Sequence, residues 1–160
     1  MTTRLVLVDN TTLTNFALVA RPELLLDLFG ADCATTKAVM AEYHAGIVSR
    51  GMPLDSWEGL KQLVLQPIEQ EFADQLPPQL GRGERSCLAI AIHRQALFVS
   101  DDAKARLVAQ QHGVIVTGTI GVLVLNVRLG QLMLAEGNAI LSRMIAQGYH
   151  SPVTVLDDLL

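Results

Sequence analysis

The chain has 160 residues, of which 50% are hydrophobic and 18% are charged, and its formal net charge is −4. This length suits one domain with a sizeable core, and this composition excludes intrinsic disorder, while no apolar run approaches the ~18 residues of a membrane span. The negative charge argues against broad non-specific binding of nucleic acid, although a local basic rim can still hold phosphates.

The first half of the chain alternates predicted strands and helices. The apolar run at 4–8 is typical of a strand that is buried on both faces. The elements predicted next are helices over 12–18 and 22–29, a weak strand over 33–35, a helix from a cap at Thr35 or Thr36 to about Arg50, a strand over 63–65 and a helix over 67–76. Gly51 and Pro53 are expected to end the helix at Arg50.

In the second half, Pro77 and Pro78 break the pattern, and a flexible turn at 81–83 precedes the next helix. The predicted elements are a helix over 84–95, a strand over 97–100, a helix over 103–111, a strand over 114–116 and helices over 119–129 and 132–147. Strands separated by helices indicate an α/β fold with a mostly parallel sheet covered on both faces. We expect one domain over 1–150 and a loosely held tail over 151–160.

Acidic residues occur where such a fold brings distant segments together. Asp9 ends the first strand, and Asp101 and Asp102 end the strand over 97–100, while Glu42 and Glu84 lie on helices between the two. In open parallel sheets the ligand crevice lies beyond the carboxyl ends of the strands. Carboxylates gathered there need a cation, and hard oxygen ligands select Mg²⁺ or Mn²⁺. The pattern therefore predicts metal-dependent phosphodiester chemistry.

Each acid also has a structural alternative. Asp9 can cap the following helix, Glu42 can be a surface residue in mid-helix, and Glu84 can stabilise a helix N-terminus. A structural role explains Asp101 and Asp102 less well, because adjacent acids repel one another unless a cation or a helix N-terminus compensates their charge.

Other polar side chains lie near these acids in sequence. Thr11 could orient a metal or a water beside Asp9, and Thr119 could meet a phosphate or simply form a turn and cap. Five basic residues are candidates for holding nucleic acid, although each alone is more often a solvated charge: Lys37, Arg82, Arg85, Lys104 and Arg106.

The cysteines and histidines carry no metal-site pattern. Cys33 and Cys87 have no CxxC partner and are expected to be buried small hydrophobes of a reducing compartment. The histidines show no zinc-ligand spacing. The N-terminus lacks the zones of a signal peptide, so a cytoplasmic protein is expected.

From about Leu5 to Gly148 the chain resembles the PIN-domain family. The resemblance rests on LVLVDNTTL, VMAEY, LGRGERSCLAIAI, LFVSDDAKAR and VTGTIGVLVLNVRLG. The last segment, with LGRGE, looks most like a prokaryotic subgroup often encoded in toxin–antitoxin pairs (VapC-toxin-like). The resemblance implies a three-layer α/β/α fold and an Mg²⁺- or Mn²⁺-dependent endoribonuclease that cleaves single-stranded or structured RNA. It also implies a homodimer and inhibition by a small antitoxin protein.

By this resemblance, the acidic quartet is Asp9, Glu42, Glu84 and Asp101, with Asp102 or Thr119 assisting. Metal would be held by Asp9, Glu84 and Asp101, and Glu42 would hold a second ion or orient water. The chain departs from the family pattern in three places. Glu84 stands where Asp is common, the doubled Asp101-Asp102 leaves the fourth ligand open, and Asn126 interrupts an apolar helix.

Four other functions were compared with the pattern. The first is a catalytically weak PIN-like module that binds nucleic acid or a protein partner. A phosphatase would need a second Asp at position 11, where Thr11 stands, and a receiver domain would carry paired acids after its first strand. Dinucleotide binding is weaker, because no GxGxxG follows the first strand.

Overall fold

The computed structural model describes residues 4–50 and 56–160, which contain a five-stranded, all-parallel sheet. The strands are β1 (Val6–Val8), β2 (Cys33–Thr36), β3 (Lys61–Leu63), β4 (Leu97–Val99) and β5 (Val116–Thr117), in the order β3-β2-β1-β4-β5. Every residue of β1 is buried, as the continuous apolar run predicts for a central strand. Val6 pairs with Cys33 on one side and with Leu97 on the other.

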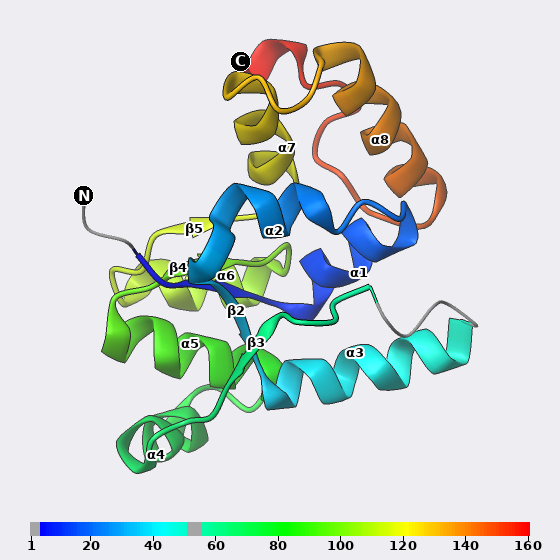
Figure 1. The fold of residues 1–160 in the computed structure, drawn as a ribbon. Coiled ribbons are helices and arrows are strands. Elements are labelled where there is room, and N and C mark those ends of the chain that lie inside the picture. The colour runs from blue at the N-terminus through cyan, green and yellow to red at the C-terminus, as the bar shows by residue number, and fades with distance from the viewer. Residues whose placement is uncertain (1–3, 51–55) are drawn as a thin grey trace.

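Helices cover both faces of this sheet. They are α1 (Asn10–Leu18), α2 (Glu23–Phe29), α3 (Lys37–Arg50), α4 (Pro67–Gln75), α5 (Arg82–Arg94), α6 (Ala103–Gln111), α7 (Thr119–Arg128) and α8 (Leu134–Ala146), with short 3₁₀ turns at 30–32 and 157–159. Figure 1 shows α1, α2, α7 and α8 on one side of the sheet and α3, α4 and α5 on the other, where α6 also packs against α5. This arrangement confirms the three-layer α/β/α fold. None of the described helices is long and apolar enough to cross a membrane.

Two predicted strands are displaced along the chain. The strand expected at 63–65 is found at Lys61–Leu63, and the one expected at 114–116 is found at Val116–Thr117. Both lie at an edge of the sheet, where one neighbour is missing and the apolar pattern is weak; Val64, predicted inside a strand, is 63% exposed. Gly51 and Pro53, which were expected to end the helix before them, lie outside the described residues.

The last ten residues do not form the loosely held tail that we expected. Leu156 is fully buried, and its N–H donates to Asn138 Oδ1 on α8 at 2.8 Å. Arg128 Nη2 at the end of α7 also donates to the Leu159 carbonyl at 2.8 Å. Leu156 is the only buried residue of this segment although several other residues in it are apolar, and short-range periodicity does not show such an anchor. The domain limits themselves remain a prediction.

One polar residue inside the core is satisfied by backbone carbonyls. Asn126, the departure noted in the apolar helix, is 2% exposed and donates through Nδ2 to the Leu24 and Val122 carbonyls at 2.9 Å each. It thereby ties α7 to α2. Cys33 and Cys87 are buried and unpaired, as predicted.

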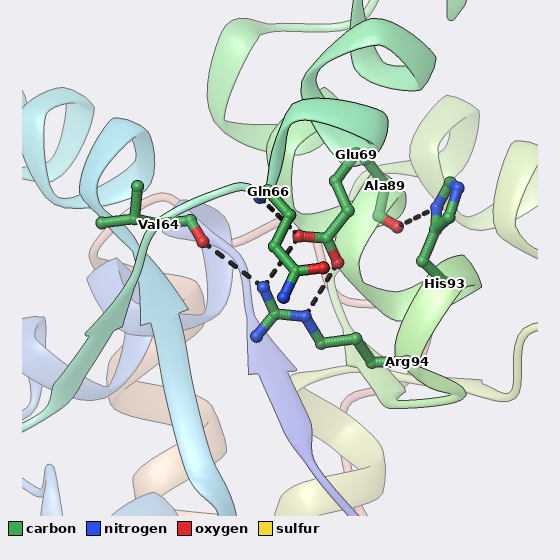
Figure 2. Close-up of polar contacts among 6 residues, drawn as sticks. All are labelled: Val64, Gln66, Glu69, Ala89, His93 and Arg94. Atoms are coloured by element: carbon green, nitrogen blue, oxygen red, sulfur yellow. Dashed lines mark hydrogen bonds and ion pairs between the residues drawn. The ribbon is translucent and has the colours of Figure 1, made fainter.

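A buried ion pair joins α4 to the end of α5, as Figure 2 shows. The Glu69 side chain is 1% exposed, and Arg94 donates to both of its oxygens, from Nε at 2.8 Å and from Nη2 at 2.7 Å. The Gln66 N–H donates to the same carboxylate at 2.7 Å, and Arg94 Nη2 reaches the Val64 carbonyl at 3.3 Å. The Arg94 guanidinium lowers the pKa of Glu69. This contact holds the chain after edge strand β3 against α5.

Candidate functional site

Asp9 lies at the carboxyl end of the central strand and is 1% exposed. Its carboxylate accepts from the Asn10 N–H at 2.7 Å and from Ser100 Oγ at 2.9 Å, and its own N–H donates to the Val99 carbonyl. It also caps α1, as the structural alternative for this residue predicts, and capping does not exclude a functional role. Burial raises the pKa of Asp9 to about 7, and the charges of Glu84 and Glu42 act in the same direction.

Glu42 and Glu84 approach Asp9 from two helices that pack together. Glu42 on α3 accepts from the Gly83 N–H at 2.8 Å, and Glu84 accepts from the Gly81 N–H at 2.9 Å in the first turn of α5. A Cβ atom on Gly81 would lie 3.7 Å from Glu42 Oε1 and 3.8 Å from Glu84 Oε2, so the two carboxylates flank this glycine. Burial raises the pKa of Glu84, and Asp102 and Glu42 raise it further.

Asp102 belongs to the same acidic group. Its carboxylate caps α6 by accepting from the Ala105 N–H at 2.8 Å, and its charge acts on Glu84. Its N–H donates to Ser100 Oγ at 3.1 Å, and the same hydroxyl donates to Asp9. Buried Ser100 therefore links the ends of β1 and β4. We call Asp9, Glu42, Glu84 and Asp102 the acidic pocket.

Asp101 forms its hydrogen bonds with residues outside the acidic pocket. It accepts from both the N–H and the hydroxyl of Thr119, the N–H at 2.8 Å. It also accepts from Asn15 Nδ2 at 3.2 Å and from Thr12 Oγ1 at 3.3 Å. These donors compensate its charge and join α1 and α7 to the end of β4. The role of Asp101 as a metal ligand remains a prediction.

The two threonines singled out in the sequence both form hydrogen bonds with Asp101. Thr11 Oγ1 accepts from the Asp101 N–H at 3.1 Å, and Thr119 donates to the carboxylate as described. Contact of either residue with a metal, water or phosphate stays a prediction.

The five basic candidates lie in different settings around this edge. Lys37, Arg82 and Lys104 are exposed, and Lys104 lowers the pKa of Glu84. Arg106 Nη1 donates to the Ser100 carbonyl at 2.9 Å. Arg82 and Arg85 line a cavity of 280 Å³ beside the start of α5, and within the described part of the chain the Arg85 Nε atom is buried without a hydrogen-bond partner. Their binding of nucleic acid is not yet tested.

Sequence reasoning missed Ser100 and Asn15. Ser100 stands between an apolar strand and two aspartates, a position where a small hydroxyl can bridge neighbouring strand ends. Asn15 follows Thr12 by three residues, so both lie on the same face of α1 and reach Asp101 together. That spacing was the available signal.

The chemistry of the acidic pocket fits a hard divalent cation, because its groups are carboxylates and the neighbouring negative charges raise the pKa of Asp9 and of Glu84. As the side chains lie, no three acidic, histidine or cysteine residues among those described converge closely enough to hold one ion. Glu42 and Glu84 are instead held by backbone N–H groups at the start of α5. Binding a cation there requires these side chains to reorient.

A parallel α/β/α sandwich with one buried and several half-buried acids at the carboxyl edge of its central strands is the architecture of a nuclease-like domain. The chain matches a family model, DUF3368, described as a PIN domain, over residues 5–160, and it therefore belongs to the PIN-domain family, whose members are generally nucleases. Comparison with curated proteins and with solved structures gave no match.

Replacing Gly83 by Ala should disturb this site. The new Cβ atom would lie 2.6 Å from Glu42 Oε2 and 3.0 Å from Val39 Cγ2, so the carboxylate must leave the Gly83 N–H. We expect a loss of about 1–3 kcal/mol in the free energy of unfolding, measured by urea denaturation. Gly46→Ala on α3 is the control, because that position faces open space and should be neutral or stabilising by up to ~1 kcal/mol. Equal effects of the two substitutions would contradict the packing described.

Proposed function

We propose that the protein is a metal-dependent endoribonuclease. One observation carries this proposal: Asp9 is buried at the end of the central strand, its pKa is raised to about 7, and further carboxylates act on it. Such crowding destabilises the fold, and groups with strongly perturbed pKa values cluster at functional sites. Membership of a family of nucleases points to the same chemistry.

Each acid of the pocket has a proposed role. Asp9, Glu84 and Asp102 would hold Mg²⁺ or Mn²⁺, and Glu42 would orient the attacking water. A bound divalent ion supplies a water of lowered pKa and offsets charge on the phosphate oxygens. We place Asp102 rather than Asp101 in this set, because its charge acts on Glu84 and Ser100 joins it to Asp9. Asp101 would position α1 and α7.

The proposed substrate is single-stranded or structured RNA. The basic candidates around the site, Lys37, Arg82, Arg85, Lys104 and Arg106, would hold its phosphates. Resemblance to the toxin subgroup supports a cytoplasmic toxin that a small antitoxin protein inhibits and that acts as a homodimer. Leu129 and Met133, which are 61% and 75% exposed at the turn between α7 and α8, offer apolar surface for either partner.

A catalytically weak module that binds nucleic acid or a protein is the second candidate. It is favoured by the way Glu42 and Glu84 are tied to backbone N–H groups, and by the lack of a ready three-ligand site in the described residues. The retention of every acid of the family pattern favours the enzyme.

Incubation with a mixed single-stranded RNA pool in Mg²⁺, in Mn²⁺ or in EDTA separates the two candidates. The enzyme should cleave in metal and not in EDTA. Asp102→Asn should then be nearly inactive, and Asp101→Asn should retain activity in proportion to its folded fraction. If fully folded Asp101→Asn lost cleavage while Asp102→Asn stayed active, Asp101 rather than Asp102 would be the metal ligand. Binding of RNA without cleavage in any metal would favour the module.

A further inference from the structure

A cavity of about 420 Å³ opens beside the acidic pocket. Asp101 and Asp102 line it, and so do Asn10 and Thr14 on the first turns of α1. Because Asn10 directly follows Asp9 and Asp102 belongs to the acidic pocket, the cavity adjoins the proposed reaction centre.

Other lining residues come from segments far away in sequence. Arg50 is the exposed last residue of α3, and the segment from Gln147 to His150 follows α8. The cavity therefore combines an acidic side, polar side chains, a guanidinium group and two aromatic rings, those of Tyr149 and His150. This set of groups matches the parts of a nucleotide, namely a base, a sugar and a phosphate.

The turn after α8 places the aromatic segment. Gly148 has φ +112°, its N–H donates to the Ile145 carbonyl, and the Tyr149 N–H donates to the Met144 carbonyl at 3.0 Å. This pair of bonds is a Schellman motif, in which the glycine reverses the chain. The reversal brings Tyr149 back toward Asp101, where burial and that charge raise the pKa of the phenol. The tyrosine is thus held in the cavity wall.

The same ring borders a second cavity. That cavity, of about 500 Å³, shares Asp101, Tyr149 and His150 with the first and adds Arg106. Tyr149 and His150 therefore border both cavities, and both cavities reach Asp101. Aromatic side chains beside cationic ones are how proteins commonly bind single-stranded nucleic acid, with bases stacked on the rings and phosphates near the charges.

We propose that the 420 Å³ cavity binds one unpaired nucleotide of the RNA substrate, next to the phosphate that is cleaved. The base would stack against Tyr149 or His150, and Arg50 would hold a phosphate. Asn10 would meet a polar edge of the base or sugar, because Thr14 Oγ1 donates to Asn10 Oδ1 at 3.2 Å and leaves the amide NH₂ group as a donor. The site rests on the proposed ribonuclease function and assigns it single-stranded RNA.

A stacked duplex does not fit this proposed mode of binding. A base inside a helix is paired and covered on both faces, so only an unpaired base can enter a recess and contact a ring. The cavity therefore predicts preference for single-stranded segments and loops over perfect duplexes.

The first experiment measures binding without cleavage. A fluorescein-labelled single-stranded RNA octamer is titrated in EDTA with wild type, Arg50→Ala and His150→Ala, and anisotropy reports Kd. Each variant should raise Kd by about fivefold or more, the effect expected for a lost stacking or phosphate contact. Matched controls are Arg143→Ala on α8 and His112→Ala after α6, two exposed residues that do not line the cavity. They should change Kd by less than about twofold.

Tyr149 needs a pair of variants, because it is partly buried. Tyr149→Phe keeps the ring and should bind within about twofold of wild type, whereas Tyr149→Leu removes the aromatic face and should weaken binding by about fivefold or more. Thermal denaturation of both shows that they are folded. Equal weakening by Phe and Leu would overturn stacking on this ring.

Parallel cleavage assays in Mg²⁺ test the nucleotide-binding proposal separately from the nuclease function. If wild type cleaves RNA and the Arg50, His150 and Tyr149 variants bind and cleave as it does, the cavity is not a nucleotide site and the ribonuclease stands. If wild type binds the same octamer equally well as a duplex, the assignment of an unpaired nucleotide fails. If wild type neither binds nor cleaves RNA, both proposals fail.

Discussion

Replacing Asp9 by Asn should lower RNA cleavage by at least about a hundredfold and leave the fold intact. The substitution keeps the size of the side chain and an oxygen that can accept from the Asn10 N–H, so the start of α1 should persist. It removes the charge that the proposed cation and transition state require at the end of β1. Cleavage rates in Mg²⁺ and circular dichroism of the same samples measure the two effects. Unchanged cleavage by the folded variant would contradict the assignment of the acidic pocket as the active site.

The same variant should be more stable than wild type at alkaline pH when no metal is present. Folding raises the pKa of Asp9 from 3.8 to about 7, so the folded protein binds a proton that the unfolded chain does not. The free energy of unfolding of wild type should therefore fall as pH rises from about 4 to about 7, by on the order of 1–3 kcal/mol from this group. Asp9→Asn should lack that component.

Thermal denaturation in EDTA between pH 5 and pH 8 tests this difference. The stability of Asp9→Asn relative to wild type should increase with pH over that range. Excess Mg²⁺ should then stabilise wild type more than the variant, because ligand binding to the folded state adds stability. A difference that does not depend on pH would mean that the buried carboxylate is not the source.

The largest effect on stability is expected from Arg94→Met, which leaves the Glu69 carboxylate buried without its partner. Removing one member of a buried ion pair costs about 3–5 kcal/mol, and the partial exposure of Arg94, 31%, reduces the expected loss to about 2–3 kcal/mol. Urea denaturation at pH 7 measures it. Arg143→Met on α8 is the matched control and should change stability by less than ~0.5 kcal/mol.

The pH dependence identifies the cause of that loss. Arg94 lowers the pKa of Glu69, so the contribution of the pair is fully present above the ordinary glutamate pKa of 4.5 and is lost as pH falls through the lowered folded value. The gap between wild type and Arg94→Met should therefore narrow below pH 4.5. The double variant Glu69→Leu/Arg94→Met should recover part of the stability, since no unpaired charge remains. A gap that is constant with pH would instead indicate lost packing of the arginine stem.

The central part of the fold could be predicted from sequence because its signals are local and strong. A fully buried strand such as β1 reads as an unbroken apolar run, and α6 lies between an aspartate cap and Gly113, so its limits were predicted correctly. The edge strands β3 and β5 were displaced because half of their pairing is missing and the apolar pattern no longer marks them. The anchored tail was missed because Leu156 depends on α8, which is distant in the chain.

For the site, the sequence by itself determined which acids lie at the carboxyl edge of the sheet, because the ends of parallel strands coincide wherever the strands pair. Only the tertiary structure decided which of those acids belong to the acidic pocket. Asp101 and Asp102 are neighbours in the chain, yet one is compensated by Thr119 and Asn15 and the other acts on Glu84. Likewise, Tyr149 is 140 residues from Asp9 in sequence, and only the reversal at Gly148 brings it to the same edge. Side-chain direction and distant packing settle such questions, and neither is encoded in local residue patterns.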